Sequence, residues 1–120
     1  MDLLSLIENQ EDMRRFEIGS VIFSEGDAPR AMYIIAEGSV SLSTGGRVIE
    51  TLNSGDIFGE VALIDTKPRT ATATVVNAAS LVEVDRDYFK FLVQQAPAFA
   101  LHVMEVLARR LRAAEPAKRI

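Results

Sequence analysis

The sequence predicts a mainly β domain of the α+β class, arranged as a β-sandwich or barrel that two helices follow. All seven glycines of the 120-residue chain lie between Phe16 and Glu60, where they separate short runs rich in β-branched and aromatic residues. Glycine supplies the positive-φ turns that join such strands. From Asp85 the apolar period changes from two toward about 3.6 residues, which predicts helices after the strands.

The N-terminal half is expected to begin with a short helix and continue as strands. Residues 2–9 carry leucine and isoleucine at the spacing of a short amphipathic helix. Strand patterns then run from about residue 16 to 84, and Thr44-Gly45-Gly46-Arg47 has the composition of a hairpin turn. The simplest organisation is one domain over residues 1–120, because a chain of this length is typical of one hydrophobic core.

Two helices are expected at the C-terminal end, at about 85–95 and 97–114. Asp85 is a suitable N-cap for the first, and Pro97 separates it from the second. The second carries a coiled-coil-like seam with steps of four, three and four residues, at Ala100, Met104, Leu107 and Leu111. The seam suggests a homodimer through this helix, and the alternative is a broad stripe buried against its own domain.

Composition excludes several kinds of site. The formal net charge is −4, which argues against a general grip on nucleic acid through the phosphate backbone. The chain has no cysteine and one histidine, His102. A cysteine-ligated metal, a cysteine nucleophile and a metal site with several imidazole ligands are therefore excluded, which argues against an enzyme such as a metal-dependent cupin. No cofactor is expected.

No segment reaches the roughly 18 to 20 uninterrupted apolar residues that cross a bilayer. The N-terminal residues MDLLSLIENQEDMRR lack the basic and apolar regions of a signal peptide. We therefore expect a cytoplasmic protein without a membrane partner.

Residues 58–76 read FGEVALIDTKPRTATATVV and contain the most informative charges, Glu60 and Arg69. Gly59 would allow close backbone approach to a ligand, and small residues such as Ala62 would leave amide groups accessible to an anion. An arginine fork suits a phosphate, and a glutamate accepts hydrogen bonds from hydroxyl groups. On these residues alone, two solvated charges on a turn remain the simpler interpretation.

The whole stretch resembles the phosphate-binding cassette of cyclic nucleotide-binding domains, of the type found in bacterial catabolite activators and protein kinase A regulatory subunits. That pattern is Phe-Gly-Glu, an apolar residue, Ala and Leu, then a loop ending in Arg, Ser/Thr/Ala and Ala, and every position is matched here. The flanking segments EGDAPRAMYIIAEGSV and LNSGDIFGE are similar to the family as well, and the resemblance extends from about Leu3 to Leu111. It implies a double-stranded β-helix, or jelly-roll barrel.

The resemblance also implies ligand roles within the cassette. Glu60 would accept a hydrogen bond from the ribose 2′-hydroxyl. Arg69 would bind the exocyclic oxygens of the cyclic phosphate of cyclic AMP or cyclic GMP. The resemblance assigns the remaining ligand contacts to Gly59, Val61, Ala62, Thr70 and Ala71.

Contacts to the base are less constrained. Leu42 and Ile49 fall on strands that line the base in this family, and a role as plain core residues explains them equally well. Thr70 permits a guanine contact without excluding cyclic AMP. Arg110 and Leu111 are candidates for a lid over the base, although Arg110 also fits a solvated position in an arginine-rich helix end.

The expected function is a signalling sensor that binds a cyclic nucleotide and repositions its C-terminal helices for an unknown downstream protein. Direct DNA binding by this chain is not expected, because a helix-turn-helix would have to follow the long helix and the sequence ends at Ile120. A standalone bacterial single-domain protein is the favoured context. The alternatives are a regulatory fragment of a transcription regulator, ion channel or kinase, and a degenerate domain that serves only protein contacts.

Overall fold

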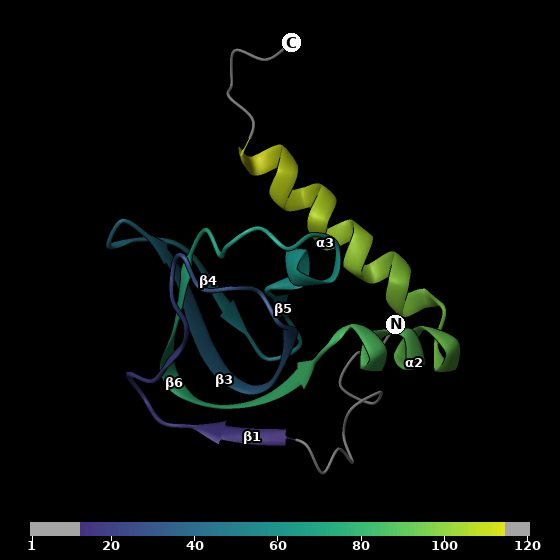
Figure 1. The fold of residues 1–120 in the computed structure, drawn as a ribbon. Helices are drawn as coiled ribbons and strands as arrows, with labels where there is room; N and C mark the ends of the chain where they lie inside the picture. Colours follow the sequence, from purple (N-terminus) through teal and green to yellow (C-terminus); the bar gives the residue numbers. More distant parts are fainter. Residues whose placement is uncertain (1–12, 115–120) are drawn as a thin grey trace.

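The fold is described from a computed structural model, which places residues 13–114. Within this range the strands come first and the two α-helices last, as the sequence predicts (Figure 1). The elements are β1 (Met13–Phe16), β2 (Val21–Phe23), β3 (Met32–Thr44), β4 (Arg47–Asn53), β5 (Ile57–Phe58), the short 3₁₀-helix η1 (Glu60–Leu63), β6 (Thr72–Val84), α2 (Arg86–Gln95) and α3 (Ala98–Ala114). The short helix predicted over residues 2–9 lies outside the described residues.

The strands form a rolled antiparallel sheet. Its main path is β1-β6-β3-β4, while β2 pairs with β6 and β5 pairs with β3. The two long strands, β3 and β6, curve around the roll in Figure 1. Their register shifts at Gly38, whose φ is 87° and whose added Cβ would lie 2.2 Å from the carbonyl oxygen of Ala78. This rolled antiparallel sheet confirms the predicted jelly-roll fold.

Each long strand divides its side chains between two apolar clusters. On β3, Tyr33 and Ile35 point into the roll, while Met32 and Ile34 point toward the helices. This alternation is the ordinary consequence of the two-residue period of a strand. The inner cluster fills the roll, and the outer cluster joins the sheet to Leu92 of α2 and to α3.

The helices pack on the outer cluster as the predicted amphipathic pattern requires. The Asp85 side chain accepts a hydrogen bond of 2.8 Å from the backbone N–H of Tyr88, which confirms this residue as the N-cap of α2. On α3, Phe99, Val103 and Val106 are buried against the sheet. No helix in the described range combines the length and apolar character needed to cross a membrane.

The predicted seam of α3 requires a correction. Leu107 is partly buried against the outer cluster and Ala100 is also partly buried, so these two members are less available to a second chain than the exposed positions of α3. A continuous row of exposed apolar side chains is formed instead by Leu101, Met104, Ala108 and Leu111. They are spaced by three, four and three residues, so α3 buries one stripe in its own domain and exposes a second.

Candidate functional site

The cassette lies where β5 leads into η1 and a loop returns to β6. Gly59 stands at the turn with a φ of 75°, a left-handed conformation that favours glycine. A Cβ there would lie 2.9 Å from Nη1 of Arg69 and 3.3 Å from the carbonyl oxygen of Ala31. Glycine is therefore required both by the backbone and by the space that the Arg69 side chain fills.

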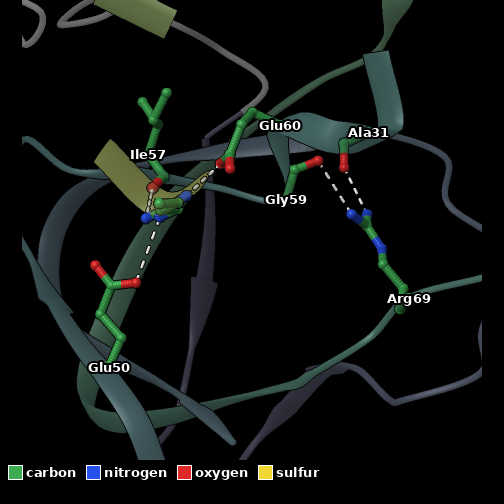
Figure 2. A network of polar contacts seen from close by, with 7 residues as sticks. Ala31, Glu50, Ile57, Gly59, Glu60 and Arg69 are labelled. Carbon is green, nitrogen blue, oxygen red and sulfur yellow. Dashed lines mark hydrogen bonds and ion pairs between the residues drawn. The ribbon is translucent and has the colours of Figure 1, made fainter. Parts of the chain in front are cut away.

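Arg69 is held by backbone carbonyls and an aromatic ring. Its Nη1 donates to the carbonyl oxygen of Gly59 at 3.0 Å, and its Nη2 donates to that of Ala31 at 2.6 Å (Figure 2). The guanidinium carbon lies 3.9 Å from the centre of the Phe23 ring, a cation–π contact. The chain around Arg69 is also fixed, because its N–H donates to the carbonyl oxygen of Asp27 at 2.8 Å.

No carboxylate within residues 13–114 forms an ion pair with Arg69. Its Nε is buried and has no hydrogen-bond partner in that range. Burial lowers the pKa of the Arg69 guanidinium, against the opposing influence of nearby acidic groups. Acidic groups thus act on Arg69 only from a distance, and a partly buried cation without a direct ion pair favours an anion at this position.

Glu60 is only 4% exposed and faces α3. Its Oε1 accepts a hydrogen bond from Nη1 of Arg110, which also forms an ion pair with it. The Nη2 of Arg110 donates to the carbonyl oxygen of Ile57 at 2.9 Å, and its Nε lies 3.3 Å from Oε1 of Glu50 (Figure 2). The buried carboxylate therefore has its own cation, which comes from the last helix.

The remaining predicted cassette residues lie around these two charges. The N–H of Ala62 donates to the carbonyl oxygen of Gly59 at 3.1 Å within η1, so this amide is already engaged. Val61 and Thr70 are exposed, and Ala71 is partly buried. The carbonyl oxygen of Thr70 accepts a hydrogen bond of 3.0 Å from the Thr44 hydroxyl, which ties the arginine loop to the hairpin turn.

The predicted base contacts separate into different environments. Leu42 belongs to the inner cluster. Ile49 is the extra residue of a β-bulge, because Leu42 pairs with Glu50 and Ser43 pairs with Val48, and its side chain is exposed. Leu111 lies on the exposed stripe of α3, whereas Arg110 is bound to the roll by the three contacts described above.

Sequence reasoning missed Phe23, Ala31 and Glu50. Ala31 contributes a carbonyl oxygen, which leaves no trace in residue type, and the Phe23 ring reaches Arg69 from a strand distant in sequence. Glu50 did leave a signal. Glu50 lies two residues before the buried Leu52 on β4, so both side chains are on the same, inward-facing side of the strand. A charged residue at such a position is unusual.

The comparison with protein families agrees with this geometry. Residues 13–96 match the family described as the cyclic nucleotide-binding domain. A curated relative, the cyclic AMP receptor protein of Thermus thermophilus, is 36% identical over 107 residues, which cover 85% of this chain and 50% of the relative. The chain thus spans about half the length of this relative and of a second curated relative, the CRP-like cAMP-activated global transcriptional regulator of Mycobacterium tuberculosis.

Two solved structures resemble the whole fold. The catabolite activator protein of Thermus thermophilus aligns with a TM-score of 0.74 and 33% identity over 92% of this chain and 53% of its own. A protein from a cyclic-GMP-dependent signalling pathway that regulates bacterial phytopathogenesis aligns with a TM-score of 0.78 and 26% identity over 94% of both chains. The matched family, the sequence identities and the shared fold agree, and this chain belongs to the cyclic nucleotide-binding domain family.

Proposed function

We propose that residues 1–120 form one domain that binds cyclic AMP or cyclic GMP and acts as a signalling sensor rather than an enzyme. In this proposal the cyclic phosphate binds Arg69 and the ribose 2′-hydroxyl binds Glu60. The observation that carries it is the pairing state of the two side chains. Arg69 is a partly buried cation that forms no ion pair among the described residues, whereas the buried Glu60 is an acceptor that is ion-paired with Arg110.

The phosphate end follows from the chemistry of Arg69. A phosphate supplies the negative charge that the carbonyl oxygens of Ala31 and Gly59 provide only as partial charges. Its oxygens accept the charge-assisted hydrogen bonds of a planar fork. Phe23 excludes water from one face of the guanidinium, which strengthens an ionic contact relative to a surface pair.

The ribose end follows from the two oxygens of Glu60. The contacts among the described residues use Oε1, which leaves Oε2 as an acceptor for a hydroxyl group. The ion pair with Arg110 offsets part of the cost of burying the Glu60 carboxylate.

The same contact connects the ligand to the helices. Arg110 belongs to α3, so a change at Glu60 alters one of the bonds that hold this helix on the roll. We propose that α2 and α3 shift when the ligand binds. Such a shift requires that the ligand bind the two helix positions with different affinity.

The choice of base stays a prediction. Thr70 is exposed beside Arg69, where its hydroxyl can contact a guanine without excluding adenine. Among the similar proteins, one is named a cyclic AMP receptor and another belongs to a cyclic-GMP-dependent pathway. We propose binding of cyclic AMP, cyclic GMP or both in a cytoplasmic protein, with a downstream protein as the receiver and no direct contact of residues 1–120 with DNA.

We propose that the domain also dimerises through α3. The exposed stripe at Leu101, Met104, Ala108 and Leu111 has the three- and four-residue spacing of a coiled-coil seam. A second copy presents the same stripe, so the contact would be symmetric.

Thermal unfolding with cyclic AMP, cyclic GMP and linear AMP tests the proposal. A ligand that binds only the native state raises the unfolding midpoint, and the rise grows with the logarithm of the ligand concentration relative to its dissociation constant. We expect a rise with at least one cyclic nucleotide and a much smaller one with linear AMP. Unchanged midpoints with both cyclic nucleotides would contradict the proposal and favour a domain that serves only protein contacts.

A further inference from the structure

One guanidinium, that of Arg110, serves two carboxylates on different parts of the roll. Its Nη1 binds Glu60, whose side chain is 5% exposed, and its Nε lies 3.3 Å from Glu50, whose side chain is 36% exposed. The third arm, Nη2, donates to the carbonyl oxygen of Ile57. The three arms together fix the plane of the fork, because a guanidinium is rigid and its donors cannot move independently.

The two carboxylates contribute in different ways. The Glu60 contact is a directed hydrogen bond. The Glu50 contact is an ion pair without hydrogen-bond geometry, since Nε has no hydrogen-bond partner among the described residues. Glu50 therefore attracts and orients the Arg110 guanidinium without accepting a hydrogen bond from its Nε.

Glu50 is placed for this task by β4. It follows the bulge residue Ile49 and pairs with Leu42 of β3. It lies two residues before the buried Leu52, so its side chain is on the same inward-facing side of β4. A bulge re-aims the side chains next to it. The consequence here is a carboxylate that reaches Arg110 of α3 while it stays partly exposed to solvent.

We infer that Glu50 is a positioning residue for ribose recognition: through Arg110 it holds Glu60 in the orientation that accepts the 2′-hydroxyl. The inference rests on the proposed function. Without Glu50, the Arg110 guanidinium keeps its hydrogen bonds to Glu60 and to the carbonyl oxygen of Ile57. It loses the ion pair that orients its Nε side. Glu60 then samples more orientations, and part of its readiness for the hydroxyl is lost.

The expected size of the effect follows from exposure. Glu50 and Arg110 border a hollow of about 200 Å³ that also reaches His102 and Arg109, so water and neighbouring charges screen the pair. Pairs of this kind contribute little, and we expect a change of about two- to fivefold in affinity.

The experiment compares a nucleotide with its 2′-deoxy form by calorimetry. The ligand is whichever of cyclic AMP and cyclic GMP the wild-type protein binds more tightly. In Glu50→Gln, we expect affinity for the ribonucleotide to fall about two- to fivefold and affinity for the 2′-deoxy form to stay unchanged. Glu37→Gln is the matched control, because Glu37 forms an exposed ion pair with Arg15 elsewhere on the roll.

A double-mutant cycle separates positioning from a general structural effect. In an Arg110→Lys background the fork is absent, so Glu50→Gln should change the ratio of the two affinities no further. Equal losses for both ligands in Glu50→Gln, or a shift of the cyclic AMP to cyclic GMP preference with the ribose dependence intact, would overturn the inference. Absence of binding by the wild-type protein would instead contradict the proposed function itself.

Discussion

The two arginines of the site, Arg69 and Arg110, are held in opposite ways. Arg69 lies under Phe23 and donates to two backbone carbonyl oxygens, with no acid paired to it among residues 13–114. Arg110 forms ion pairs with Glu50 and Glu60. The difference teaches that a cation is available to a ligand only where the fold has not already neutralised it. We therefore propose that Arg69 binds the phosphate and that Arg110 connects α3 to the roll.

The largest expected effect is on binding at Arg69. Arg69→Ala should weaken cyclic nucleotide binding by about 2 to 4 kcal/mol, or about 30- to 900-fold, because the phosphate loses its charged partner. Titration calorimetry measures the affinity. Arg15→Ala, an exposed arginine on β1, is the control and should bind normally. Unchanged affinity in Arg69→Ala would remove this residue from the site.

For Arg110, in contrast to Arg69, the main expected effect of substitution is on the stability of the fold. Arg110→Ala leaves the buried Glu60 without its cation and should lower the free energy of unfolding by about 1 to 3 kcal/mol. Urea denaturation measures the loss. Adding Glu60→Gln in the same protein removes the unpaired charge and should restore part of the stability. A loss no greater than that of Arg69→Ala would contradict the contrast between the two arginines.

Gly59 tests whether the arginine pocket depends on one missing side chain. Gly59→Ala should cost about 1 to 2 kcal/mol of unfolding free energy for its left-handed backbone. It should also weaken ligand binding, because the new Cβ meets Nη1 of Arg69. Gly19→Ala is the matched control: Gly19 has a φ of 90° but nothing within 4 Å of an added Cβ. For Gly19→Ala we expect a similar loss of stability with normal binding. Normal binding in Gly59→Ala as well would show that Gly59 is not part of the binding site.

The smallest effect on the domain itself is expected at the exposed stripe of α3. Met104→Glu should leave folding and ligand affinity unchanged and should weaken self-association, because it places a charge in the proposed seam. Light scattering over a range of concentrations reports the oligomeric state. Phe91→Glu, at an exposed apolar position on α2, is the control. A wild-type protein that stays monomeric at high concentration, with and without ligand, would refute the dimer.

The sequence predicted the order of strands and helices because period and glycine spacing are local properties. A family pattern singled out Glu60 and Arg69 as candidate ligand residues, and their role stays a prediction. The sequence could not predict which groups surround each charge. The carbonyl oxygens of Ala31 and Gly59 carry no side-chain signal, and the approach of Arg110 to Glu60 depends on how α3 crosses the roll.

The seam of α3 shows a similar limit. Spacing alone permits two apolar stripes on this helix, 100/104/107/111 and 101/104/108/111, which share Met104 and Leu111. Only packing against the outer cluster decides between them, because Leu107 is partly buried against that cluster. Helical period predicts that faces exist, whereas the contacts with the sheet decide which one is covered.

The measurement that tests the central claim most directly is a crystal structure of the protein with the cyclic nucleotide it binds. The account predicts phosphate oxygens within hydrogen-bonding distance of the Arg69 guanidinium, and the ribose 2′-hydroxyl donating to Glu60, which keeps its contact with Arg110. A phosphate bound at Arg110, with Arg69 still donating only to the carbonyl oxygens of Ala31 and Gly59, would contradict it.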